Sequence, residues 1–288
     1  MTSDLEADGR FTETFDGYAL VGRYRHAASA APCGLLALHG ARSDHRRLDP
    51  LLRPLQVAGV ASLGCDLSGH GDGSPLPSAQ TSLARNLQEA LRFAQRLGAG
   101  PDTVFGHSLG GALAMKVAEH FGQTVRTLIL SGPALYPEAA FSVPHYGPDF
   151  TRAISTPFGF MDSLSLPFLR RFAGRVILIT GQHDGLPAER HGGVCGRSAG
   201  LVEVADGAGA RRTVYSPIPA EVFEAIRDAA GDRLSEIVLD GCDHKVLAHL
   251  ADHPEVAHSL TQRLLHLIGR GPQALRCGIA TDGAVRTL

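Results

Sequence analysis

The chain has 288 residues, which is enough for one large α/β domain or two small ones. Hydrophobic residues make up 44% of it and charged residues 19%, the balance of an ordinary soluble globular protein. A formal net charge of −2 argues against a nucleic-acid-binding protein, because such proteins carry a basic surface.

The cysteines are scattered along the chain and none forms a C-x-x-C pair: Cys33, Cys65, Cys195, Cys242 and Cys277. Cys33, Cys65 and Cys242 lie in or beside apolar, strand-like runs, which is typical of small buried thiols. This usage favours a reducing compartment. Residues 1–8 are acidic and lack the apolar core of a signal peptide. Since no apolar run approaches membrane-spanning length either, we expect a cytoplasmic protein without stable membrane association.

The first half of the chain alternates between strand-like and helix-like patterns. Residues 10–26 predict a β-hairpin that turns at Asp16-Gly17. Strands are then expected at 34–38, 61–66, 103–105 and 125–130, and helices at 47–58, 80–97 and 112–118. This alternation predicts a mostly parallel, doubly wound sheet with helices on both faces.

The alternation breaks between residues 133 and 172. This stretch holds six prolines and six of the 12 phenylalanines of the chain. So many prolines argue against regular sheet units, and the aromatic density favours a short lid or cap with an apolar underside. A long, self-packed loop is the alternative interpretation.

Regular elements return after residue 173. A strand is expected at 175–181, a helix at 218–230, a strand at 236–240 and a final helix at 254–268, whereas residues 187–216 predict an excursion of loops. We therefore expect an α/β core made of residues 1–132 and 173–270, a lid at 133–172, and a mobile tail at 271–288.

A G-x-S-x-G pattern, Gly106-His107-Ser108-Leu109-Gly110, lies between an expected strand and an expected helix. In this nucleophile elbow, a sharp turn holds the serine hydroxyl above the sheet edge, and glycines avoid clashes with the neighbouring strand and helix. The pattern predicts that Ser108 is a catalytic nucleophile.

A serine nucleophile needs a base and a carboxylate that orients the base. Asp184 and His244 follow the expected strands 175–181 and 236–240, so both lie where parallel strands end at the edge that carries Ser108. We predict Asp184 as the acid and His244 as the base. The alternatives are Glu138 for the acid and His70 or His183 for the base, while the side chain of His107 should point away from the serine oxygen.

Backbone amides are expected to form an oxyanion hole. The residue after the nucleophile supplies one, at Leu109, and Ala41 in the loop after strand 34–38 supplies the other. Residues expected to contact substrate are His39 and the apolar lid residues Phe141, Tyr146, Phe158 and Met161. A structural hydrogen bond is the alternative role for His39.

No cofactor is predicted. The sequence shows no cluster with metal-ligand spacing and neither a P-loop lysine pattern nor an early dinucleotide fingerprint. We expect a small molecule as the partner of this protein and no nucleic acid, and the sequence does not indicate an oligomeric state.

Five motifs, taken in order, resemble the α/β-hydrolase superfamily over about residues 15–270: Leu38–Gly40, Asp66–Gly71, Gly106–Gly111, Gly181–Asp184 and Gly241–His244. They look most like bacterial esterases and the lysophospholipase or monoacylglycerol-lipase-like group. The resemblance implies structural roles for Asp66 and His70 in a D-x-x-G-H-G turn. A serine at position 108, where haloalkane dehalogenases and epoxide hydrolases carry aspartate, argues against those branches.

The sequence thus predicts a serine hydrolase that cleaves an ester or thioester of a small to medium apolar acyl or aromatic substrate through an acyl-enzyme intermediate. The alternatives are a C–C hydrolase, a peptidase of the proline-iminopeptidase type, and an acyl-transfer or ring-forming tailoring enzyme. The physiological substrate is not indicated.

Overall fold

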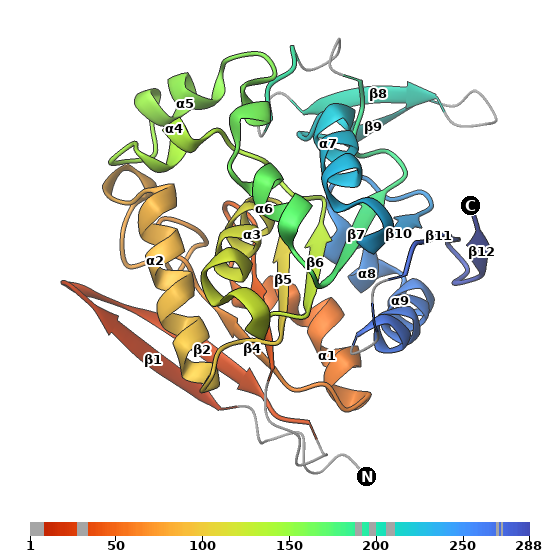
Figure 1. The fold of residues 1–288 in the computed structure, drawn as a ribbon, viewed down its shortest axis with the longest axis horizontal. Helices are drawn as coiled ribbons and strands as arrows, with labels where there is room; N and C mark the ends of the chain where they lie inside the picture. Colours follow the sequence, from red (N-terminus) through yellow and green to blue (C-terminus); the bar gives the residue numbers. More distant parts are fainter. Residues whose placement is uncertain are drawn as a thin grey trace.

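The computed structural model describes residues 9–27, 34–187, 192–195, 200–205, 211–268, 271 and 273–288. Within this part of the chain a ten-stranded sheet runs through the centre of the molecule (Figure 1), in the order β1-β2-β4-β3-β5-β6-β7-β10-β11-β12. Its strands are β1 (Arg10–Phe15), β2 (Tyr18–Arg25), β3 (Leu35–Leu38), β4 (Ser62–Cys65), β5 (Thr103–His107), β6 (Thr127–Ser131), β7 (Arg175–Gly181), β10 (Leu234–Leu239), β11 (Leu275–Ile279) and β12 (Val285–Thr287).

The middle of the sheet is parallel. Seven neighbouring strands pair in parallel, in the order β4, β3, β5, β6, β7, β10 and β11. At the two ends of the sheet the pairing is antiparallel, between β1 and β2, between β2 and β4, and between β11 and β12. All residues of β3, β6 and β7 are buried, as their continuous apolar runs require in a sheet covered on both faces. The predicted mostly parallel, doubly wound sheet is therefore confirmed, and its strands bring their carboxyl ends to one edge.

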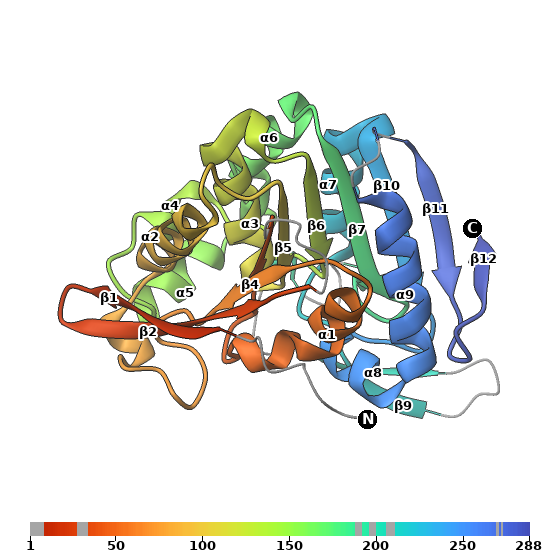
Figure 2. The same ribbon diagram turned by 90° about the horizontal axis from the view of Figure 1, so that it is seen from below.

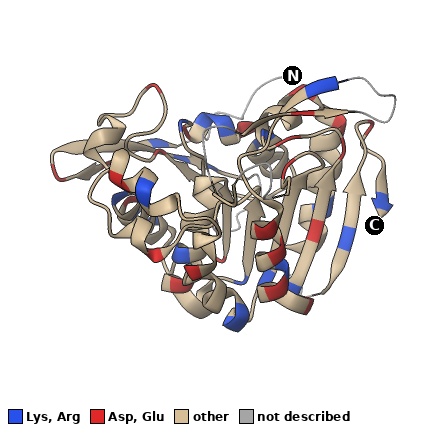
Figure 3. Cartoon of the chain, turned by 90° about the horizontal axis from the view of Figure 1, so that it is seen from above, with Lys and Arg blue, Asp and Glu red and all other residues tan. Residues whose placement is uncertain are grey.

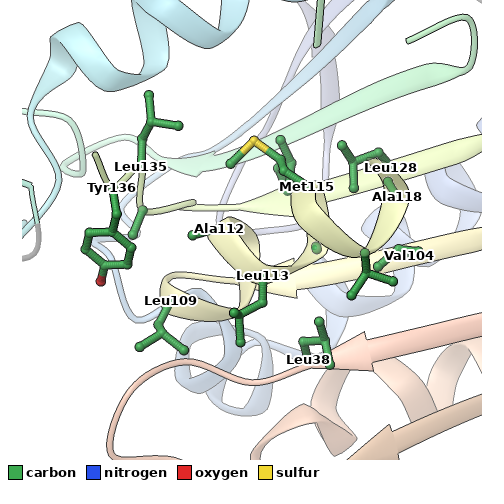
Figure 4. Close-up of a cluster of buried hydrophobic side chains, with 14 of the residues drawn as sticks. Leu38, Val104, Leu109, Ala112, Leu113, Met115, Ala118, Leu128, Leu135 and Tyr136 are labelled. Carbon is green, nitrogen blue, oxygen red and sulfur yellow. The ribbon is translucent and has the colours of Figure 1, made fainter. Parts of the chain in front are cut away.

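Helices cover both faces of the sheet (Figure 2). Helices α1 (Asp49–Val57), α8 (Val246–Asp252) and α9 (Pro254–Leu267) pack together on one face, and α2 (Leu83–Ala94), α3 (Leu109–Phe121), α6 (Ser165–Arg171) and α7 (Ala220–Ala230) cover the other. Helix α3 contributes apolar side chains to the core on this second face, where Leu113 and Met115 lie among residues of β3, β5 and β6 (Figure 4). This packing fixes the helix that begins directly after Ser108.

The segment between β6 and β7, residues 133–172, contains helices α4 (Glu138–Phe141) and α5 (Pro148–Ile154) as well as α6. We call it the lid segment. Two of its six prolines mark helix starts: Pro137 is the N-cap residue of α4 and Pro148 is the first residue of α5. Lys116 of α3 anchors it, because its ammonium group lies 2.6 Å from the Glu138 carboxylate and over the ring of Phe141.

Two expectations about the second half of the chain are wrong. The sequence predicts a mobile tail at residues 271–288, but β11 extends the sheet beside β10 and β12 closes this end. The excursion at 187–216 contains a two-stranded antiparallel hairpin, β8 (Leu201–Ala205) and β9 (Arg211–Tyr215), rather than loops alone. Both elements are short, and β11 gains its hydrogen bonds from a distant strand, so local sequence pattern predicts them poorly.

Cys65, Cys195, Cys242 and Cys277 are buried free thiols, and Cys33 lies outside the described residues. Basic and acidic residues are interspersed in the view of Figure 3. Among the helices that the structure describes, none combines the length and the apolar character needed to cross a bilayer.

Candidate active site

Ser108 lies at the sharp turn between β5 and α3, with a φ of 54° and a ψ of −119°. This positive-φ conformation is costly for a residue with a side chain and is held by its surroundings. The Ser108 amide donates to the Ser131 carbonyl, and the Ser108 carbonyl accepts from the Gly111 and Ala134 amides, at 2.9–3.0 Å. The backbone is thereby fixed on both sides of the serine.

The glycines of the elbow are required by close approach. A Cβ atom on Gly106 would collide with the carbonyl of Gly110, and one on Gly110 would collide with the carbonyl of Leu38 at the end of β3. The start of α3 therefore packs directly on the backbone of two strands. This geometry explains why the residue types of the motif occur at this spacing.

Ser108, His244 and Asp184 form one continuous chain of hydrogen bonds. The Ser108 Oγ lies 2.9 Å from His244 Nε2, and His244 Nδ1 lies 2.7 Å from Asp184 Oδ2. Asp184 can only accept when ionised, so Nδ1 carries the proton and Nε2 is left to accept from the serine hydroxyl. The structure thus brings the three residues together in the order that general-base activation of a serine requires.

Glu138, His107 and His70 have other partners. Glu138 forms the ion pair with Lys116 described above. His107 packs its ring 5.1 Å from that of His244 and donates from Nδ1 to the Ser131 carbonyl at 3.0 Å, so it points away from the serine oxygen. His70 is bonded to Asn86 through Nε2.

The hairpin β8–β9 supports the acid and the base, which sequence reasoning missed. The carbonyl of Tyr215, the last residue of β9, accepts from the His244 amide at 2.9 Å. The next residue, Ser216, donates its hydroxyl to Asp184 Oδ1 at 3.3 Å, and the Gly185 amide donates to the same oxygen at 3.1 Å. Asp243 accepts from the amides of Tyr215 and Lys245 at 2.8 Å and so connects the hairpin to the loop that follows β10 and carries His244.

Gly132 is a second residue that the sequence analysis missed. It follows β6 with a φ of +46°, and a Cβ atom there would lie 2.9 Å from Asp184 Oδ2 and 3.0 Å from His244 Nδ1. Its only sequence signal is its place directly after a strand end, in Ser131-Gly132-Pro133.

Gly132→Ala is expected to separate Asp184 from His244. We predict a loss of roughly 100-fold in kcat, since misplacement of a reacting group by about 1 Å has that cost, with destabilisation of about 1–2 kcal/mol from the left-handed backbone. Ester kinetics and urea unfolding measure the two effects. Gly73→Ala is the control, because a Cβ atom at Gly73 meets nothing within 4 Å; equal losses in both variants would contradict the prediction.

The two amides expected to form an oxyanion hole belong to Leu109, at the first position of α3, and Ala41, in the loop after β3. A helix leaves its first amides without an intrahelical partner. Among the described residues, neither amide donates to a protein acceptor. Both remain available to an oxygen that develops negative charge beside Ser108.

The expected substrate contact of His39 is corrected by its surroundings. Its side chain is fully buried, Nδ1 donates to the Gly40 carbonyl at 2.8 Å, and Nε2 accepts from the Leu67 amide at 3.1 Å. Burial also lowers the pKa of His39. Because both ring nitrogens are used, His39 joins the loops that follow β3 and β4 and has the structural role weighed as its alternative.

Burial lowers the pKa of His70 to about 4 and that of His107 to about 3. An unfolded histidine titrates near pH ~6.5, so below that pH the unfolded chain binds protons that the folded chain excludes. We expect the free energy of unfolding to be highest above pH ~6.5 and to fall by about 1 kcal/mol per pH unit and histidine towards pH ~4. Urea unfolding between pH ~7 and pH ~5 measures this slope, and His70→Asn should flatten it; an unchanged slope would contradict the assignment.

The apolar lid residues fall into two groups. Phe141 and Tyr146 are partly buried and pack against the apolar core on the sheet face that α2, α3, α6 and α7 cover. Phe158 and Met161 are 47% and 51% exposed, and the Phe158 amide donates to the Gly193 carbonyl at 2.7 Å. Substrate contact by these four residues remains a prediction.

One group in the described part of the chain has the residue types of a metal site: Asp44, His45 and Asp66, whose candidate ligand atoms lie within 4.8 Å of one another. These atoms already have partners. Asp66 Oδ1 accepts from the amide and Nδ1 of His45, and Asp44 holds Arg46 at 2.6 Å. The group therefore fits a hydrogen-bonded support of the two loops, consistent with the structural role expected for Asp66.

The comparisons with known proteins agree with this geometry. Residues 32–160 match the family model described as serine aminopeptidase, S33. Lipase LipV of Mycobacterium tuberculosis is 33% identical over 106 residues, which is 37% of this chain and 39% of the lipase. The alignment therefore spans well under half of that relative's length.

Solved structures show the same fold at low sequence identity. Est1E of Butyrivibrio proteoclasticus, with ferulic acid bound, has a TM-score of 0.61 at 17% identity and covers 90% of this chain and 100% of its own. A thioesterase domain from the curacin biosynthetic pathway has a TM-score of 0.59 at 17% identity, with the same coverage. Together with the parallel sheet and the elbow at its edge, these findings show that the chain has the α/β-hydrolase fold, and in sequence it resembles hydrolases of the esterase and lipase type.

Proposed function

We propose that this protein is a serine hydrolase that cleaves an ester or thioester with a small to medium apolar acyl or aromatic part. The observation that carries the proposal is the hydrogen-bonded series Ser108–His244–Asp184 at a strained elbow. A lone serine is a weak nucleophile, and this arrangement is what activates it.

In the proposed reaction, Ser108 Oγ attacks the carbonyl carbon while His244 Nε2 takes the serine proton. The carbonyl oxygen becomes an oxyanion that accepts hydrogen bonds from the amides of Leu109 and Ala41. His244 then gives its proton to the leaving alcohol or thiol, and the acyl group stays on Ser108. Water, deprotonated by His244, attacks the acyl-enzyme; the acid leaves and the proton returns to Ser108.

Asp184 stays ionised throughout this cycle. Its carboxylate holds Nδ1–H of His244 and stabilises the imidazolium that forms in each half-reaction. Its side chain is shielded from water and its second oxygen accepts from Ser216 and Gly185. These neutral donors position the carboxylate without neutralising its charge.

A peptidase that removes N-terminal residues needs a carboxylate to bind the substrate amine, and the lid segment offers Glu138, Asp149 and Asp162. Glu138 is paired with Lys116, and Asp149 with Arg152 at 2.7 Å. Two of the three carboxylates are therefore already paired with a basic side chain, which weakens the case for recognition of a substrate amine. We favour an acyl ester or thioester over a peptide substrate.

Hydrolysis of a p-nitrophenyl ester series from acetyl to lauroyl tests the proposal. The expected result is turnover with an optimum at an intermediate chain length, because an acyl group of fitting length buries the most apolar surface. Proline p-nitroanilide and an acyl thioester serve as matched substrates for the peptidase and thioesterase alternatives. Faster turnover of the anilide than of every ester would contradict the proposal, and labelling of Ser108 by a fluorophosphonate without any hydrolysis would favour transfer to another acceptor.

A further inference from the structure

We propose that His70 is a positioning residue for the oxyanion loop, residues 39–43, and that Asn86 connects it to Tyr146 of the lid segment. The seating of the lid segment and the geometry of the oxyanion hole would then be coupled through one buried hydrogen-bond network. This inference rests on the proposed function, because it assigns the loop that carries the Ala41 amide a role in catalysis.

The oxyanion loop has a strained residue at its tip. Arg42, next to Ala41, has a φ of 58°, a left-handed conformation that residues with a Cβ atom seldom adopt. Its amide donates to Nδ1 of His70 at 3.4 Å. Both Ala41 and Arg42 are exposed, so this long hydrogen bond is a contact that ties the tip of the loop to the protein interior.

The acceptor role of His70 Nδ1 follows from the groups on its other side. Asn86 is fully buried on α2, and its Nδ2 donates to the Ser68 carbonyl and to Glu89 Oε2, each at 2.9 Å. The Asn86 carbonyl oxygen must therefore face His70, whose Nε2 lies 3.0 Å away and has to carry the proton. This leaves the Nδ1 lone pair free to accept from Arg42, and burial keeps the ring neutral by lowering its pKa to about 4.

The lid segment shares the same asparagine oxygen. Tyr146 donates its hydroxyl to Asn86 Oδ1 at 2.7 Å, and its amide donates to the Thr81 carbonyl at 2.8 Å. Its ring lies 5.3 Å from that of His70. A lid segment that moved away would remove the Tyr146 hydroxyl from Asn86 and the Tyr146 ring from His70 in one step.

A buried carboxylate keeps the inner end of the network in place. Glu89 is 1% exposed and accepts from the Ser68 amide at 2.9 Å, the Ser68 hydroxyl at 2.5 Å and the Tyr18 hydroxyl at 2.6 Å. These partners come from β2 and from the loop after β4. Since Asn86 is held on this side, a change at Tyr146 is passed on through His70 towards the loop.

Two substitutions separate the bonds of His70. Glutamine places its amide at the reach of Nε2, so His70→Gln keeps the bond to Asn86 and loses the acceptor for Arg42. Asparagine places its carbonyl at the reach of Nδ1, so His70→Asn keeps the acceptor and loses Asn86. We expect His70→Gln to lower kcat for p-nitrophenyl esters about 10-fold with KM changed less than about 3-fold, and His70→Asn to stay within about 3-fold of the wild type in kcat.

Tyr146→Phe tests the link to the lid segment. It should lower kcat about 3-fold alone and add nothing in the His70→Gln background, because the path to the loop is already broken there. Tyr24→Phe is the matched control, since the Tyr24 hydroxyl donates to the Arg96 carbonyl far from the site. Additive effects of the two substitutions would overturn the coupling.

Two readouts separate this inference from the proposed function. Imidazole ¹⁵N spectra of the wild type should show His70 protonated at Nε2 and not at Nδ1, and the opposite tautomer would overturn the inference whatever the activity. Fluorophosphonate labelling of Ser108 should slow in His70→Gln and not in His70→Asn. Equal rates in both variants would overturn only the role of His70, whereas a wild type that neither labels nor hydrolyses any ester would overturn the proposed function and this inference with it.

Discussion

Ser108→Ala is expected to reduce kcat for p-nitrophenyl esters by at least ~10⁴-fold while KM changes little. Without the hydroxyl, no acyl-enzyme can form, and only the oxyanion amides and substrate binding remain to accelerate attack by water. Steady-state hydrolysis of the preferred ester measures kcat and KM, and mass spectrometry after fluorophosphonate treatment should find no added phosphonyl group at position 108.

Ser259→Ala is the matched control. Ser259 lies on α9 and donates its hydroxyl to the Gly283 carbonyl, so its loss removes a serine oxygen without touching the elbow. This variant should hydrolyse the ester at the wild-type rate. Retention of more than about a tenth of the wild-type kcat in Ser108→Ala would show that another group performs the attack.

Asp184→Asn should lower kcat by about 10⁴-fold with the fold intact. Because Ser216 and Gly185 donate to the other side-chain oxygen, asparagine would place its amide donor where a carboxylate oxygen now holds Nδ1–H of His244 at 2.7 Å. The imidazole would then adopt the tautomer with the proton on Nε2, which cannot take the proton of Ser108. Single-turnover acylation followed across pH isolates this step from deacylation.

Asp240→Asn provides the comparison for that variant. Asp240 lies just after β10 and pairs with Arg286 at 2.7 Å on the surface, where an ion pair contributes little. Its replacement should leave kcat unchanged. If Asp184→Asn retained kcat within about 10-fold of the wild type, a different carboxylate would have to orient His244. The next residue to replace by mutation would then be Glu138, which is paired with Lys116.

The parts of this fold that sequence patterns predict are those that local chemistry determines. Continuous apolar runs such as Leu35–Leu38 and Val176–Ile179 give the buried parallel strands, since such runs suit a sheet covered on both faces. The positions just after β5, β7 and β10 meet because parallel strands end at one edge. The meeting of Ser108, Asp184 and His244 follows from topology more than from any single residue.

The remainder depends on contacts between distant parts of the chain. The sequence Leu275–Ile279 reads Leu-Arg-Cys-Gly-Ile and has no continuous apolar run that would predict a strand; β10 supplies its hydrogen-bond partners. Tyr215 likewise supports His244 only because β9 ends beside the loop that follows β10 and carries His244. Gly132 shows the same limit, because its importance lies in the two side chains that its missing Cβ atom would meet. Prolines in the lid segment argue against regular structure when only the sequence is considered, whereas Pro137 and Pro148 occupy the one region of a helix that tolerates them.

The chain contains two lysines, and the structure gives them different chemical accessibility. The amine of Lys116 is paired with Glu138 and its side chain is 11% exposed, whereas Lys245 is exposed directly after His244, with its amine over the ring of Tyr215. Apart from the chain's own α-amino group, an amine-reactive dye or resin would therefore attach at the rim of the catalytic site. When the catalytic site must stay accessible, Lys245→Arg is the variant to immobilise or label. In the wild type, a fluorescent probe attached to Lys245 would report on substrate that enters the catalytic site.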